Sequence, residues 1–135
     1  MKKIFLLLFI VLISSTSVTS FGQTTLDTVN VVKPEKYPGY KTGLNGWTDF
    51  LVKNLDRDLP VKEGAPAGRY TVLASFVVDS VGKVSDIMID HDPGYNTAKE
   101  VKRIIALTDK RWTPAYSNGR PISYRHRQSI TFVVN

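Results

Sequence analysis

The segment that most constrains the fold spans residues 69–79 (RYTVLASFVVD) and has the pattern of a β-strand. Alternate residues on one face are apolar: Tyr70, Val72, Ala74, Phe76 and Val78. The other face is also partly apolar, because it carries Leu73 and Val77. Apolar residues on both faces are typical of a strand in the interior of a sheet. We therefore expect this strand to have a neighbour on each side.

Residues 83–91 (KVSDIMIDH) are expected to form the first of these neighbours, because the connection at 79–82 (DSVG) is a tight turn that ends in glycine. A hairpin with unbroken pairing brings apolar residues together on both faces. Its register pairs Val78 with Lys83, Val77 with Val84, Ala74 with Ile87, Leu73 with Met88 and Val72 with Ile89.

Two amphipathic helices are predicted on either side of this hairpin. The first follows Asn45, a suitable N-cap, and carries the apolar stripe Trp47, Phe50, Leu51 and Leu55. The second opens with a capping box of Thr97 and Glu100 and carries the stripe Ala98, Val101, Ile104 and Ile105, with Lys110 and Arg111 near its C-terminal end. Residues 56–68 contain two prolines and two glycines and are expected to form a loop.

The last predicted strand covers residues 121–134, and the order is then helix, strand, strand, helix, strand. We predict an α+β two-layer sandwich, with a three-stranded antiparallel sheet in the order 2-1-3 and both helices on one face. In this arrangement the last strand is an edge strand, and its outward backbone groups are unpaired. Its faces alternate: Ile122, Tyr124, Ile130, Phe132 and Val134 on one, and Ser123, Arg125, Arg127, Ser129 and Thr131 on the other.

The composition excludes several chemistries. The chain has no cysteine, so disulfides and thiol catalysis are ruled out, and its two histidines, His91 and His126, are accompanied by no nucleophile motif. Asp86, Asp90 and Asp92 alternate along a strand without a calcium-binding loop, so a solvated face is the favoured interpretation. Trp112 is interpreted as a core residue. We expect no enzymatic activity, no cofactor, no metal and, since the net charge of +6 falls to about +4 without Lys2 and Lys3, no nucleic-acid binding.

The N-terminus has the pattern of a secretory signal peptide over residues 1–22: two lysines, an apolar run at 4–13 and small residues before Gln23. A membrane anchor is the alternative, but the apolar run is about half the length that spans a bilayer. We expect cleavage, no remaining membrane span, and a periplasmic or secreted protein. Residues 23–36 are then a flexible lead-in, and residues 37–135 form the domain.

Several short motifs in residues 37–135 occur together in one order. They are FLVKNL at 50–55, Gly68, FVVD at 76–79, GKV at 82–84, Asp86-Ile87, WTPA at 112–115, NGRPI at 118–122 and ITF at 130–132. In this set and its spacing the chain resembles the TonB C-terminal domain family. The resemblance implies a periplasmic module that binds an extended peptide, the TonB box, of an outer-membrane receptor and takes part in TonB-dependent transport.

The resemblance places partner binding on the last strand, at Tyr124, Arg125, His126, Arg127, Gln128, Ser129 and Thr131. Strand addition supplies main-chain hydrogen bonds, and the two arginines favour an acidic or polar peptide. The alternative interpretation of Arg125 and Arg127 is a solvated edge whose charge blocks aggregation. The expected partner is an outer-membrane TonB-dependent receptor or another envelope protein, and edge pairing also allows a homodimer. A soluble accessory domain without an energy-transducing role, and a small secreted enzyme, remain as alternatives.

Overall fold

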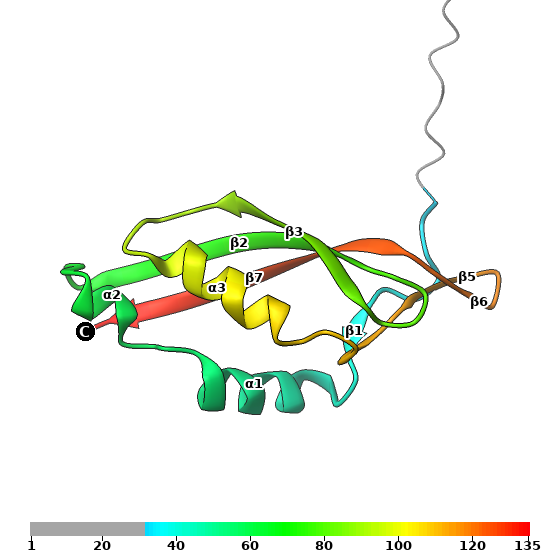
Figure 1. Cartoon of the computed structure of the whole chain (residues 1–135), viewed down its shortest axis with the longest axis horizontal. Coiled ribbons are helices and arrows are strands. Elements are labelled where there is room, and N and C mark those ends of the chain that lie inside the picture. The colour runs from blue at the N-terminus through cyan, green and yellow to red at the C-terminus, as the bar shows by residue number, and fades with distance from the viewer. Residues whose placement is uncertain (1–31) are drawn as a thin grey trace, which may run out of the picture. The chain divides into compact units, whose positions relative to one another are not determined.

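The structure is a computed structural model that describes residues 32–135 (Figure 1). The predicted signal peptide (1–22) and most of the predicted lead-in (23–36) lie outside the described residues. No helix in the described part of the chain is long and apolar enough to cross a membrane.

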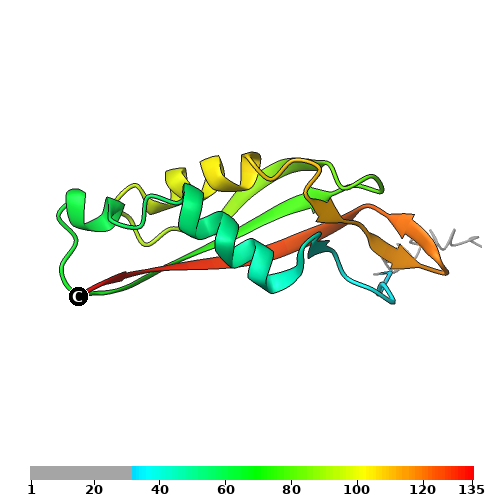
Figure 2. The same cartoon turned by 90° about the horizontal axis from the view of Figure 1, so that it is seen from below.

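The main sheet has three antiparallel strands in the order β3-β2-β7, where β2 is Gly68–Val78, β3 is Val84–His91 and β7 is Tyr124–Val134. Helices α1 (Gly43–Asn54) and α3 (Thr97–Ala106) cover one face of this sheet (Figure 2). The predicted α+β class and the three-stranded antiparallel sheet are therefore confirmed. The strand predicted to be central, β2, pairs with β3 on one side and with β7 on the other.

Four further strands are too short to have been recognised from their pattern. β1 (Gly39–Tyr40) pairs with β4 (Trp112–Thr113), and β5 (Ala115–Ser117) pairs with β6 (Arg120–Ile122). The prediction of one strand over 121–134 is wrong at its start, because Ser123 separates β6 from β7. The interval 56–68 is not entirely a loop either, since it contains the short helix α2 (Leu59–Lys62), with Pro60 in its first turn.

The predicted register of the β2–β3 hairpin is also wrong. Val78 lies opposite Val84, Ala74 opposite Ile89, and Ser75 opposite Met88. The pairing shifts twice, between Leu73 and Ala74 and between Ser75 and Val77, and at each shift β3 has one residue more than β2. Ile87 and Ile89 still pack against the core, as the unbroken alternation predicts, but Ile89 lies opposite Ala74 and not opposite the predicted Val72.

Both predicted helix starts need correction. α1 begins at Gly43, with Thr42 as N-cap, and therefore starts before Asn45. α3 has Asn96 as N-cap, and the Thr97 hydroxyl donates to the carbonyl of Gly94 (2.6 Å), so the predicted capping box does not form.

Glu100 instead connects α3 to the segment that follows α1. Its carboxylate accepts a hydrogen bond from the backbone N–H of Asp56 (2.9 Å) and forms an ion pair with Arg103. Hydrogen bonding from Arg103 lowers the pKa of Glu100, which keeps this buried group charged. α3 ends at Ala106, so Lys110 and Arg111 do not lie in the last turn of α3 but in the connection from α3 to β4.

The core lies between the sheet and the two helices. Val72, Ala74, Phe76 and Val78 are buried on the helix-covered face of β2, as their alternation predicts. Trp112 closes one end of this core, where it is 2% exposed and its indole N–H donates to the hydroxyl of Thr108 (2.8 Å). The prediction of Trp112 as a core residue is confirmed.

Candidate functional site

The candidate site is the outer edge of β7. Each of the eleven residues of this strand lies opposite one residue of β2, from Tyr124 opposite Val78 to Val134 opposite Gly68, with no register shift. Within residues 32–135, β2 is the only strand that pairs with β7. The backbone groups that point away from β2 are therefore a regular row of donors and acceptors along an edge.

A groove between α1 and the C-terminal half of β7 follows this edge, with a volume of about 600 Å³. Its β7 side is formed by residues 129–133. α1 and the residue after it contribute Leu51, Val52 and Leu55, and the side chain of Val52 is 55% exposed. Thr48, Arg57 and Asp58 also line this groove, so its surface is part apolar and part polar.

The N-terminal half of β7 borders a second hollow of about 510 Å³, lined by Tyr37, Tyr124, Arg125, His126 and Arg127. The rings of Tyr37 and Tyr124 meet edge to face, with centroids 5.5 Å apart. A smaller hollow, of about 260 Å³, includes His126 and Gln128. Hollows thus follow the length of β7, and their lining changes from aromatic and cationic to a mixture of aliphatic, hydroxyl and charged residues.

The structure divides the predicted binding residues between the two faces of the sheet. Tyr124, His126 and Gln128 lie on the helix side and border the hollows. His126 is half-buried between the rings of Phe76 (5.4 Å between centroids) and Trp112 (5.0 Å), and burial lowers its pKa below the ordinary value of 6.5.

The other four lie on the helix-free face. Arg125 reaches across β2, donates to the hydroxyl of Ser75 (3.3 Å) and forms an ion pair with Asp86 of β3, so it is held within the sheet. Thr131 shares a hydrogen bond with Thr71 (2.9 Å). Arg127 and Ser129 are exposed, so Arg127 is the cation that this edge presents to a partner.

Sequence reasoning missed the contribution of α1 and of Tyr37 to this edge. The signal in α1 was present: Leu44 and Val52 are apolar but fall outside the predicted buried stripe, and they are 78% and 55% exposed. In the structure both residues line hollows beside β7, Leu44 together with His126 and Val52 together with residues 129–133. Tyr37 gave no comparable signal, because its position depends on the pairing of Lys36 with Tyr116.

The described residues contain no group of three or more histidine and carboxylate side chains that could hold a metal ion. Each of the three aspartates on or after β3 has a local partner. Asp86 pairs with Arg125, Asp90 accepts from Ser75 (3.2 Å), and Asp92 accepts from the backbone N–H of Gly94 (2.8 Å). His91 and His126 lie on different strands, with β2 between them.

No protein-family model matches this chain, and no curated protein matches its sequence. The geometry of β7 and its grooves is therefore the feature of the described residues that points to a function.

Proposed function

We propose that this protein is a non-enzymatic, TonB-like periplasmic binding module that captures an extended peptide by adding it as a strand beside β7. The observation that carries the proposal is the unshifted eleven-residue edge with a groove along it. Main-chain hydrogen bonds along β7 supply affinity, at about 0.5–1.5 kcal/mol net for each bond, and the grooves supply selectivity.

The two halves of the edge select different parts of the peptide. Alternate side chains of an added strand point to the same face, so every second residue of the peptide faces α1. Near residues 129–133 these positions meet Leu51, Val52 and Leu55, which favour apolar side chains, while Arg57 and Asp58 in the same groove favour polar ones. Near Tyr124 and His126 they favour aromatic side chains, whereas the alternate peptide positions, on the helix-free face, pass Arg127 and favour acidic side chains. The partner that fits the resemblance is the TonB box of an outer-membrane receptor.

A chemical-shift titration tests this proposal directly. The ¹⁵N-labelled domain is titrated with a synthetic peptide that carries the TonB box of an outer-membrane receptor. We expect amide signals of residues 122–132 to move and those of β3 to remain in place. Movement of residues 56–68 with no change in β7 contradicts the proposal.

Matched substitutions in two helices sharpen the test. Val52 lines the groove and Val61 of α2 does not, yet both side chains are 55% exposed. Loss of about 1 kcal/mol of apolar contact weakens binding about fivefold, so Val52→Asp should weaken peptide binding by at least this factor. Val61→Asp should leave the affinity unchanged. Equal losses in the two variants contradict a role for the α1 groove.

A further inference from the structure

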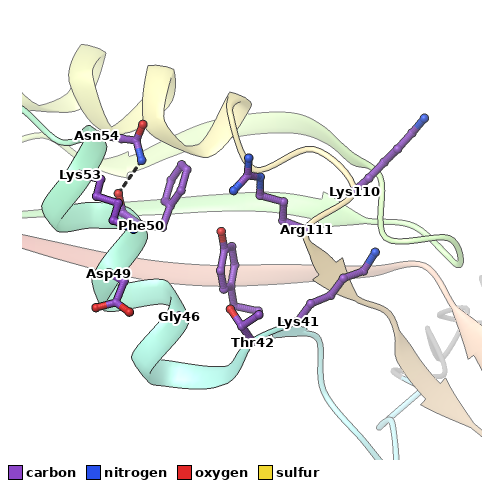
Figure 3. A pocket seen from close by; sticks show the side chains of 10 residues that line it. Lys41, Thr42, Gly46, Asp49, Phe50, Lys53, Asn54, Lys110 and Arg111 are labelled. Atoms are coloured by element: carbon purple, nitrogen blue, oxygen red, sulfur yellow. Dashed lines mark hydrogen bonds between the residues drawn. The ribbon is translucent and has the colours of Figure 1, made fainter.

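A separate hollow lies on the opposite side of α1 from the β7 groove. It has a volume of about 360 Å³ and is formed by α1, the residues before it and the connection that follows α3 (Figure 3). The residues of α1 that line it are Gly46, Asp49, Phe50, Lys53 and Asn54, whereas those that line the β7 groove are Thr48, Leu51 and Val52. The two surfaces therefore share no residue of α1.

This hollow is strongly basic. Lys41, Lys53, Lys110 and Arg111 line it, and Asp49 is the one acidic residue among its lining residues, which leaves an excess of three positive charges (4 − 1). The ion pairs within residues 32–135 are Lys62–Asp56, Arg103–Glu100 and Arg125–Asp86, and none involves these four cations. Like charges gathered around a concave surface raise the local concentration of anions.

The backbone fixes the positions from which these cations extend. The N–H of Lys41 donates to the carbonyl of Arg111 (2.9 Å), which joins the segment before α1 to the segment after α3. The N–H of Arg111 donates to the carbonyl of Thr108 (2.9 Å), and Lys110 in this turn has a left-handed backbone (φ 60°). The guanidinium of Arg111 lies over the ring of Phe50, 5.3 Å from its centroid. Lys110 and Arg111 thus extend from a hydrogen-bonded turn, and Lys41 extends from the segment that is hydrogen-bonded to it.

We propose that this basic hollow, formed around Lys41, Lys53, Lys110 and Arg111, binds the phosphate group of a phosphate ester. A phosphate group suits this excess of positive charge, because an arginine guanidinium can donate two parallel hydrogen bonds to phosphate oxygens and lysine ammonium groups act as point charges. The volume lies in the range of small-molecule sites, about 300–1,000 Å³. Tyr40 and Phe50 line the same hollow and provide an apolar wall for the group esterified to the phosphate.

The test uses phenyl phosphate and inorganic phosphate as ligands in amide chemical-shift titrations. We expect saturable binding, with movement of the amide signals of Lys41, Lys53, Lys110 and Arg111, and weakening as salt is raised. The double variant Lys41→Gln/Lys110→Gln should lower the affinity at least about tenfold. The control Lys99→Gln/Lys102→Gln removes two exposed lysines of α3 that do not line the hollow and should lower it less than about twofold.

Vesicle binding separates a free phosphate ester from a lipid headgroup. Phosphatidylglycerol vesicles are compared with phosphatidylcholine vesicles in co-sedimentation, with the same two double variants. Loss of phosphatidylglycerol binding only in Lys41→Gln/Lys110→Gln assigns the hollow to a headgroup, whereas saturation with phenyl phosphate alone assigns it to a free ester. Equal losses in the two double variants, or no saturable binding of any ligand, overturn the proposal.

Val52→Asp separates this site from the β7 groove, because it should leave phosphate binding unchanged.

Discussion

The two edges of the main sheet differ in regularity. β3 has eight residues and carries one extra residue relative to β2 at each of two register shifts, whereas β7 has eleven residues and no shift. Asp86 of β3 also has a left-handed backbone (φ 48°). A bulged strand presents an irregular row of hydrogen-bonding groups and pairs poorly with a further strand. The sheet is therefore blocked on one edge and open on the other.

The charged side chains of the two edge strands, β3 and β7, also differ. β3 carries Asp86 and Asp90, and Asp92 follows it, while Arg127 is the exposed cation of β7. Charge and bulges on an edge strand are common means of preventing edge-to-edge aggregation. With β3 protected, this sheet has one open edge, so two copies that paired through β7 would form a dimer and would not propagate into a stack. The same asymmetry suits a module that binds one peptide.

The largest expected effect comes from the turn that connects β2 to β3. A Cβ on Gly82 would lie 2.2 Å from the carbonyl oxygen of Trp112, and its φ is +84°. Gly82→Ala combines the left-handed penalty of about 1–2 kcal/mol with overpacking of about 1–3 kcal/mol, so we expect unfolding to become about 2–5 kcal/mol easier. Urea denaturation measures this change.

Gly119→Ala provides the control, because Gly119 also has a positive φ (+71°), but no atom lies within 4 Å of the position that an alanine methyl group would take there. Its expected loss is about 1–2 kcal/mol, from the backbone conformation alone. Similar losses in both variants would mean that the contact between the turn and β4 does not hold the blocked edge in place.

A smaller effect is expected on the pH dependence of the unfolding free energy, through His126 of β7. Burial lowers the folded-state pKa of His126 below its unfolded value of about 6.5, so the unfolded chain takes up this proton more readily. The contribution of His126 to stability is therefore complete above about pH 6.5 and is lost as the pH falls toward the lower folded-state pKa. Urea denaturation between about pH 7.5 and 5 measures this loss.

His126→Gln isolates the effect, since the difference in unfolding free energy between wild type and variant should shrink as the pH falls. A constant difference across this range would show that His126 titrates alike in the folded and unfolded chains. The imidazole of His126 would then be more open to water than its packing against Phe76 and Trp112 indicates.

Residue alternation and helical periodicity were enough to predict the α+β class, the main sheet and the buried face of β2. These signals come from burial, which repeats with the period of the strand or helix. The β2–β3 register could not be predicted in this way, because each bulge depends on a local backbone conformation such as that of Asp86. The short pairs β1–β4 and β5–β6 were missed because two or three residues give no measurable period.

The candidate site was predicted only in part, for a related reason. The sequence placed Tyr124, His126 and Arg127 on one strand, but the groove also needs α1, which is remote in sequence. The ion pair of Arg125 could not be predicted, because its partner Asp86 lies on a strand two positions away in the sheet. Contacts between distant segments follow from packing and leave no local pattern.

The smallest expected effect concerns the link between the two edges, the ion pair of Arg125 with Asp86. The side chains are 37% and 60% exposed, so solvent screens the pair and its contribution should be below about 1 kcal/mol. Asp86→Asn tests this, because asparagine also tolerates the left-handed backbone and only the charge is lost. A double-mutant cycle with Arg125→Gln measures the coupling. A coupling above about 2 kcal/mol would show that the two edges are joined more firmly than their exposure indicates, and that the open edge depends on the blocked one.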